Sequence, residues 1–257
     1  MNLRPVNGTQ LDVRQIPGSG TLAPLVFLHE GLGAIGMWTQ RGLDWPQAVC
    51  EATGRAGIVY SRRGYGHSEA VAQGRNVLNV DYMHREAWAV LPELLAQLGV
   101  EKPVLLGHSD GATIALLYAS RFDVTACIAM APHVLVEELA VDAITQARQA
   151  FETSGLRERL AKYHDDVDGA FWQWNDVWLS HAFRSFDIRA ECSAITAPLL
   201  LVQGEDDEYG SMLQLDEIAA AVPHATQLRL ADCGHSPHRD QPQKTAEAVA
   251  GFLSGKS

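Results

Sequence analysis

A serine between two glycines is the residue of this chain best suited to act as a nucleophile. The sequence reads Gly107-His108-Ser109-Asp110-Gly111, a G-x-S-x-G pattern. An apolar run at 103–107 precedes Ser109, and small apolar residues at 111–120 follow it. In a strand–turn–helix setting this pattern exposes the hydroxyl on a sharp, strained turn, and the glycines remove Cβ atoms that would clash there. The alternative, that Ser109 only caps a helix, needs neither glycine.

The elements that must position this serine alternate regularly along the chain. Short apolar runs bounded by glycine or proline predict strands that are buried on both faces. They lie at 24–29, 57–61, 103–107, 124–130, 198–203 and 226–230. Helical spacing of apolar residues predicts helices at 81–98, 111–120, 212–221 and 243–253. This alternation indicates an α/β fold with a mostly parallel central sheet and helices on both faces.

One segment interrupts the alternation. Residues 133–190 contain helical patterns and an aromatic cluster, WQWNDVW, but no convincing strand. We therefore predict a helical cap at 133–190, inserted into a core domain formed by residues 1–132 and 191–257. A single core of this size is compatible with the length of 257 residues.

Five motifs, each just after a predicted strand, resemble those of the α/β-hydrolase superfamily in both type and order. Besides the serine motif they are His29-Glu30-Gly31-Leu32-Gly33, Arg63-Gly64-Tyr65-Gly66-His67-Ser68, Gly204-Glu205-Asp206-Asp207 and Gly234-His235. The resemblance covers nearly the whole chain. It implies the α/β-hydrolase fold with an inserted helical cap. Two residues depart from the usual pattern: Glu30 stands where the family usually has glycine, and Asp110 stands where it usually has an apolar residue or glutamine.

The resemblance implies a catalytic triad of Ser109, Asp207 and His235. A serine hydroxyl is a poor nucleophile until a base removes its proton, and His235 would be that base. Asp207 would hold His235 in the correct tautomer. The G-x-x-D spacing favours Asp207, with Asp206 as the alternative. We expect His238 to be exposed or to lie behind the catalytic residues, because it lacks the preceding glycine.

The oxyanion hole should consist of two backbone N–H groups. One belongs to Asp110, and Gly31 is the preferred second donor, with Glu30 or Leu32 as alternatives. An Asp110 carboxylate that pointed into the hole would oppose an oxyanion. We therefore predict that this side chain points away, or is paired with an arginine or the helix N-terminus. His29 and Arg63 are expected to order neighbouring loops.

Several residues are candidates for the substrate pocket. Trp174 and Trp178 are four residues apart and share one helical face, where they either attach the cap to the core or line an apolar pocket. His133 begins the cap just past a strand end. The full candidate set is Glu30, Leu32, His108, His133, Trp174 and Trp178.

These residues predict a serine hydrolase, foremost a carboxylesterase that cleaves a small or medium-sized ester through an acyl-Ser109 intermediate. Thioesters, lactones and amides use the same machinery. One alternative is a C–C bond hydrolase acting on a ring-fission or β-diketone-like product, with Arg184 or Arg189 as anchors if they point inward. Others are perhydrolase activity and a ligand-binding receptor on a hydrolase scaffold. A serine at position 109 argues against the dehalogenase and epoxide hydrolase classes, which need a carboxylate nucleophile.

Composition narrows the class of partners. The formal net charge of −11 disfavours binding to nucleic acid and to anionic membranes. We expect no metal and no cofactor, because the cysteines lack metal-binding spacing and no nucleotide motif is complete. The four cysteines are expected to be buried thiols of a cytoplasmic protein, since no apolar signal core or membrane span is evident. The sequence leaves the oligomeric state open.

Overall fold

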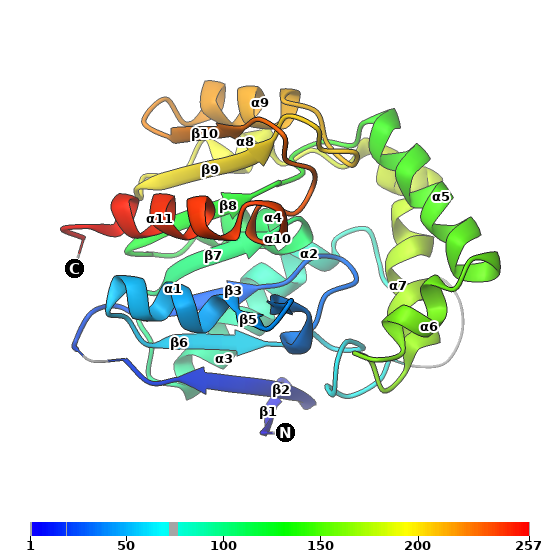
Figure 1. Cartoon of the computed structure of the whole chain (residues 1–257), viewed down its shortest axis with the longest axis horizontal. Coiled ribbons are helices and arrows are strands. Elements are labelled where there is room, and N and C mark those ends of the chain that lie inside the picture. The colour runs from blue at the N-terminus through cyan, green and yellow to red at the C-terminus, as the bar shows by residue number, and fades with distance from the viewer. Residues whose placement is uncertain (1, 19, 72–76, 257) are drawn as a thin grey trace.

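The structure of the protein, a computed structural model, describes residues 2–18, 20–71 and 77–256. Within them, eight strands form one sheet in the order β1-β2-β6-β3-β7-β8-β9-β10 (Figure 1). Neighbouring strands from β6 to β10 are parallel, and β1 and β2 join antiparallel. This confirms the predicted mostly parallel sheet. The strands are β1 Leu3–Val6, β2 Thr9–Ile16, β3 Leu25–Leu28, β6 Gly57–Tyr60, β7 Val104–His108, β8 Ala126–Met130, β9 Leu199–Gly204 and β10 Thr226–Leu230; β4 Thr39–Gln40 and β5 Leu43–Asp44 form a separate pair.

Alternate residues of the central strands enter two separate hydrophobic cores. In β3, Leu25 and Phe27 pack on one face of the sheet, whereas Val26 and Leu28 pack on the other. This two-sided burial explains why the runs are continuously apolar. All six predicted strands are present. Strands β1 and β2 were missed, because this hairpin at the sheet edge leaves polar side chains partly exposed and so lacks a continuous apolar run.

Helices cover both faces of the sheet. The core on one face contains residues of α1 and α11, which lie in front of the strands in Figure 1. The core on the other face contains residues of α3, α4 and α9. These helices are α1 Trp45–Thr53, α2 Tyr82–Arg85, α3 Leu91–Gln97, α4 Asp110–Ala119, α9 Leu213–Ala221, α10 Pro237–Asp240 and α11 Pro242–Leu253. The helix predicted at 81–98 is present as α2, a π-helical turn η2 (Glu86–Val90) and α3 in succession.

Local sequence explains the limits of α1, which we did not predict. Asp44 caps its start by accepting a hydrogen bond from the Gln47 N–H, and Pro46 lies in the first turn. Gly54 ends the helix with φ of 67°, a conformation that glycine adopts readily.

The chain between β8 and β9 is helical, as the sequence predicted. It forms α5 Glu138–Thr153, α6 Leu156–Leu160, α7 Val167–Trp178, the 3-10 turn η3 His181–Ser185 and α8 Arg189–Cys192. Helices α5 to α7 lie beyond the ends of the strands (Figure 1). His164 anchors this cap, because its Nδ1 accepts a hydrogen bond from the Gly66 N–H and its Nε2 donates one to the Leu32 carbonyl. The domain limits at 133 and 190 stay a prediction.

No helix among the described residues combines the length and the apolar character needed to cross a membrane.

The contact of α4 with β3 gives a first testable prediction. A Cβ added at Gly111 would lie 2.0 Å from the Leu28 carbonyl oxygen, which is main chain and cannot move aside easily. We expect Gly111→Ala to lower the free energy of unfolding by about 1–3 kcal/mol, measured by urea denaturation.

The matched control is Gly251→Ala in α11. A Cβ at Gly251 meets nothing within 4 Å, so this change should raise the free energy of unfolding by about 0.5–1 kcal/mol. Equal effects at the two glycines would contradict the proposed close approach.

Candidate active site

Ser109 occupies a strained turn between β7 and α4. Its φ of 53° and ψ of −120° lie in a region that side chains other than glycine rarely adopt. A Cβ at Gly107 would lie 2.1 Å from the Gly111 carbonyl oxygen, so the turn closes only with a glycine on that side. Both flanking glycines are therefore required by contacts, as the sequence predicted, and Ser109 is 7% exposed.

His235 and Asp207 form a close pair in two loops after β9 and β10. His235 Nδ1 lies 2.9 Å from Asp207 Oδ1 and 3.0 Å from Oδ2. Asp207 Oδ1 also accepts hydrogen bonds from the N–H groups of Tyr209 and Gly210, which fix the carboxylate. The structure thus places Asp207, rather than Asp206, against the histidine. Because His235 donates a hydrogen bond from its Nδ1–H to Asp207, Nε2 is left as its basic nitrogen.

The charges around His235 favour its protonated form. Burial by itself lowers its pKa, but the hydrogen bond and charge of Asp207, with the nearby carboxylates of Glu208 and Glu30, raise the pKa above the usual value. For Asp207, burial by itself raises the pKa, but the hydrogen bond and charge of His235 lower it overall. Glu208 was not predicted as a site residue; its Oε2 accepts a hydrogen bond from the His235 N–H at 3.2 Å.

The two backbone segments predicted to form the oxyanion hole are the start of α4 and the turn after β3. Asp110 begins α4, so its N–H has no acceptor in the preceding turn of that helix. Gly31 lies in the turn after β3, which closes with a hydrogen bond from the Gly33 N–H to the Glu30 carbonyl. The close packing of Gly111 on Leu28 brings the start of α4 against the end of β3. The choice of Gly31 over Glu30 or Leu32 stays a prediction.

The Asp110 side chain turns into the core, away from an oxyanion. Its Oδ2 accepts a hydrogen bond from the Tyr82 hydroxyl at 2.6 Å and lies 3.6 Å from Arg62 Nη1. Tyr82 in turn accepts a hydrogen bond from Trp178 Nε1 of the cap. The predicted pairing with an arginine is therefore confirmed. Burial raises the pKa of Asp110, although Arg62 and Tyr82 oppose this shift.

Arg62, rather than the predicted Arg63, is the arginine that orders these loops. Arg62 is 5% exposed and donates a hydrogen bond to the Glu30 carbonyl, whereas Arg63 pairs with Glu69 at the surface. The sequence could not show which of the two adjacent arginines is buried, because burial depends on the segments that pack around a residue.

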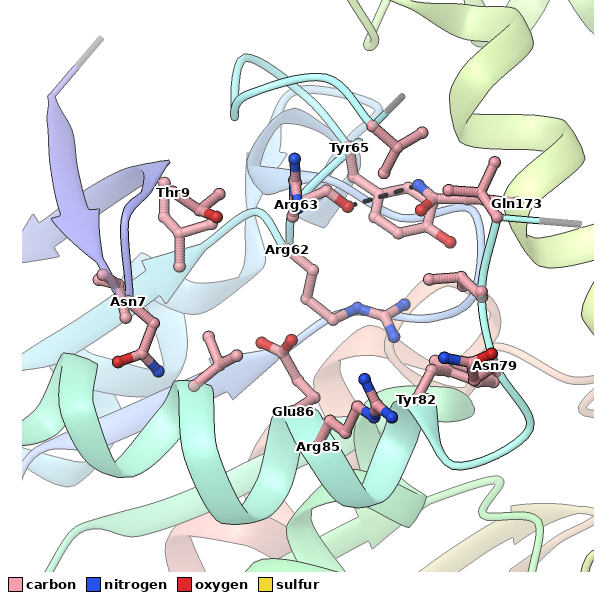
Figure 2. A pocket seen from close by; sticks show the side chains of 16 residues that line it. Asn7, Thr9, Arg62, Arg63, Tyr65, Asn79, Tyr82, Arg85, Glu86 and Gln173 are labelled. Carbon is pink, nitrogen blue, oxygen red and sulfur yellow. Dashed lines mark hydrogen bonds between the residues drawn. The ribbon is translucent and has the colours of Figure 1, made fainter. Parts of the chain in front are cut away.

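A cavity of about 380 Å³ is lined in part by Arg62 and Tyr82, but not by Asp110. Figure 2 shows the Arg62 side chain extending across it, between Glu86 and Tyr82 on one side and Tyr65 on the other. The residues lining this cavity do not include Ser109, Asp207 or His235. We therefore assign it no part in the chemistry of Ser109.

His29 performs the structural role expected of it. Its Nε2 accepts a hydrogen bond from the Arg62 N–H at 3.0 Å, and its Nδ1 donates to the Glu30 carbonyl at 2.7 Å. Burial, together with the charge of Arg62, lowers its pKa well below the usual value, so the ring is neutral as these two contacts require.

Glu30 and His108, two of the candidates for the substrate pocket, take part in a buried charged cluster, and their place in a pocket stays a prediction. His108 is 1% exposed and donates from Nδ1 to the Glu30 carboxylate, and Arg239 pairs with the other carboxylate oxygen. His238 is buried against the His108 ring, so it lies behind the catalytic residues. Ligand-type atoms of Glu30, His108 and His238 lie within 4.8 Å of one another, a composition that metal sites also use. Here His108 and Glu30 have their polar atoms paired within the protein.

The other pocket candidates gather at the contact between cap and core. The Trp174 indole lies so close to Gly31 that a Cβ there would be 2.2 Å from Nε1. The His133 ring centroid lies 5.0 Å from the Trp178 ring and 5.7 Å from that of His235. Burial lowers the pKa of His133 to about 3, so this ring is neutral. Leu32 contributes its carbonyl to the cap anchor, His164.

The four cysteines, Cys50, Cys127, Cys192 and Cys233, are free and buried, as expected.

The strain at Ser109 generates a second prediction. Glycine adopts φ of 53° without penalty, whereas alanine does not. We expect Ser109→Gly to have a free energy of unfolding about 1 kcal/mol higher than Ser109→Ala. Denaturant titration of the two variants measures the difference, and a more stable alanine variant would show that the turn is relaxed.

Comparison with known proteins places this geometry in a family. Residues 25–248 match the model of the alpha/beta hydrolase family. The chain is 27% identical to the sn-1-specific diacylglycerol lipase ABHD11 of Mus musculus, covering 98% of this chain and 87% of the lipase. It is 25% identical to the bifunctional esterase/perhydrolase DCH of Acinetobacter calcoaceticus, covering 72% and 75% of the two chains. The enol-lactonase of Burkholderia xenovorans LB400 has the same fold, with a TM-score of 0.73, 21% identity and coverage of 98% and 100%. The protein is a hydrolase that belongs to the alpha/beta hydrolase family.

Proposed function

We propose that the protein is a serine hydrolase that cleaves small or medium-sized carboxylic esters through an acyl-Ser109 intermediate. The observation that carries the proposal is the His235–Asp207 pair, with Nδ1 to Oδ1 at 2.9 Å. The His235 ring centroid lies 5.0 Å from that of His108, the residue before the serine on the strained turn. A hydrogen bond from His108, the residue before Ser109, to the His235 carbonyl joins the two loops. Together these supply a nucleophile, a base and a group that orients the base.

Acylation would follow from this arrangement. His235 Nε2 takes the proton of the Ser109 hydroxyl as Oγ forms a bond to the ester carbonyl carbon. The negative charge that develops on the carbonyl oxygen is stabilised by the N–H groups of Asp110 and Gly31. The C–O bond to the alcohol then breaks, and His235 returns its proton to the departing alkoxide. The products of this half-reaction are the alcohol and acyl-Ser109.

Deacylation repeats the steps with water. His235 takes a proton from water as its oxygen bonds to the acyl carbon, and the Ser109 oxygen leaves with that proton. The products are the free acid and the original enzyme. Asp207 stays ionised throughout and stabilises the imidazolium, as its lowered pKa favours.

Two kinds of observation support an ester of modest size. The names of two relatives, a diacylglycerol lipase and an esterase/perhydrolase, denote ester hydrolysis. Aromatic rings stand close to the site, with Trp174 against Gly31 and Trp178 against His133. Rigid rings at these places limit the space available to an acyl group and favour an apolar one.

The C–C hydrolase alternative loses its candidate anchors. Arg184 pairs with Glu138, and Arg189 pairs with Asp187 and Glu217. Both arginine side chains are exposed by about two-fifths, at 37% and 43%, so neither is directed into a buried site.

Labelling with a fluorophosphonate tests whether Ser109 is an activated nucleophile. We expect one adduct per chain, on Ser109, and none in Ser109→Ala, because the reagent phosphonylates only a serine activated by a base. Hydrolysis of p-nitrophenyl acetate should fall by roughly 10³-fold or more in the same variant.

Mass spectrometry locates the adduct, and p-nitrophenyl esters of increasing chain length measure the acyl space. Labelling without ester turnover would favour C–C cleavage or a receptor role. A folded wild-type protein in which Ser109 is not labelled would refute the proposed nucleophile.

The pH profile provides a separate prediction about His235. Only neutral His235 can accept the serine proton. Against the effect of burial, Asp207 raises the pKa of His235 above the usual value of about 6.5. The rate of labelling should therefore fall as the pH decreases, with a midpoint above that value. Asp207→Asn removes the group that raises this pKa, so the midpoint should shift to lower pH, and the plateau rate should fall roughly 10³- to 10⁴-fold. Glu205, an exposed residue two positions before Asp207, offers the control. Glu205→Gln should leave both the midpoint of the pH profile and the plateau rate of labelling unchanged.

A further inference from the structure

His108 makes two hydrogen bonds that fix its protonation state. Nδ1 lies 2.9 Å from Glu30 Oε2, and Nε2 lies 2.7 Å from the His235 carbonyl oxygen. A carbonyl oxygen and an ionised carboxylate can only accept hydrogen bonds. Both ring nitrogens must therefore carry a hydrogen, and His108 is a buried imidazolium.

Glu30 supplies the charge that balances this cation. Burial alone would raise its pKa, but Arg239 and His108 lower the pKa well below the usual value, so the carboxylate is ionised. Arg239 Nη2 donates to Oε1 while His108 donates to Oε2. The Glu30 carboxylate thus lies between two cations, His108 and Arg239, and such pairing is the condition under which buried ions are tolerated.

Two histidines near His108, His238 and His133, are weak bases, so they do not compete with it for a proton. The His238 ring centroid lies 4.7 Å from that of His108. Burial, together with the charges of His108 and Arg239, lowers the pKa of His238 well below the usual value. His133 is neutral for the same main reason, its burial. Among the described residues, the ionisable groups around His108, Glu30 and His235 are His29, Arg62, His133, His164, Asp207, Glu208, Tyr209, His238 and Arg239.

This cluster connects three parts of the site that are remote in the sequence. Glu30 lies in the turn after β3 that contains Gly31. His108 precedes Ser109, and the carbonyl that it binds belongs to His235, 127 residues further along the chain. A single imidazolium thus ties the oxyanion turn to the main chain of the base. The residue after His29, where the family usually has glycine, is what makes the connection available here.

We propose that Glu30 and His108 are positioning residues for His235: Glu30, held by Arg239, keeps His108 doubly protonated, and His108 fixes the main chain of the base beside Ser109. The proposal rests on the proposed function of Ser109 and His235. It assigns Glu30 and His108 no contact with the reacting atoms.

Nuclear magnetic resonance of protein with 15N-labelled histidine tests the charge state directly. In the wild type, one histidine should have both ring nitrogens protonated, and its signals should vanish in His108→Gln. In Glu30→Gln the carboxylate is gone, so His108 should carry a single ring proton. A wild-type His108 with a single ring proton would overturn the proposal, whatever Ser109 does.

Inactivation by a fluorophosphonate tests the positioning role. In Glu30→Gln we expect the maximal rate of inactivation to fall about tenfold, with the concentration for half-maximal rate unchanged, because the base is displaced while the binding space is kept. Glu205→Gln, an exposed glutamate that loses the same charge, is the matched control and should behave as the wild type. Glu30→Gln with wild-type kinetics in folded protein would refute the role.

A double-mutant cycle covers the case in which one variant is unstable. His108→Gln keeps an amide nitrogen as a hydrogen-bond donor but removes the positive charge, so it should also slow inactivation. Adding Glu30→Gln to it should cause little further loss, because both act through the same contact. Additive losses would contradict the proposal. If wild-type Ser109 is not labelled, the proposed function fails instead, and the resonance experiment still decides the protonation of His108.

Discussion

The close approach of α4 to β3 is the constraint on which the rest of the site depends. A Cβ at Gly111 would lie 2.0 Å from the Leu28 carbonyl oxygen, and one at Gly107 would lie 2.1 Å from the Gly111 carbonyl oxygen. Because both positions are glycine, the helix begins directly against the strand end and Ser109 is forced to φ of 53°. The same approach places the Asp110 N–H beside the turn that contains Gly31. The close approach therefore sets the geometry of the turn that holds Ser109.

Buried charge is the second theme of the structure. Two departures from the usual family pattern, Glu30 and Asp110, each bring a carboxylate next to the nucleophile, where an unpaired charge would be costly. Each has a buried or half-buried arginine: Arg239 for Glu30 and Arg62 for Asp110. The departures therefore come with compensating residues, Arg62 in the loop after β6 and Arg239 in α10.

The cap contributes to this arrangement through a small set of polar contacts. His164 joins the loop at Gly66 to the Leu32 carbonyl, and Trp178 donates to Tyr82, which donates to Asp110. Cap and nucleophile helix are thus linked by a continuous chain of hydrogen bonds. Trp174 packs against Gly31 and Trp178 against His133, which attaches the cap to the core. That these rings also line a substrate pocket stays a prediction.

The sequence by itself determined the parallel strands and the serine turn, because these depend on local patterns: two-sided burial makes a continuous apolar run, and a tight turn demands glycine at fixed spacing. The edge hairpin β1–β2 lacks such a pattern and was missed. Tertiary structure decided which charged groups meet. Asp207 rather than Asp206 contacts His235, Arg62 rather than Arg63 is buried, and Glu30 pairs with His108. Adjacent residues of one type cannot be distinguished in the sequence. Only the packing of distant segments decides which of them is buried and therefore needs a hydrogen-bond or ion-pair partner.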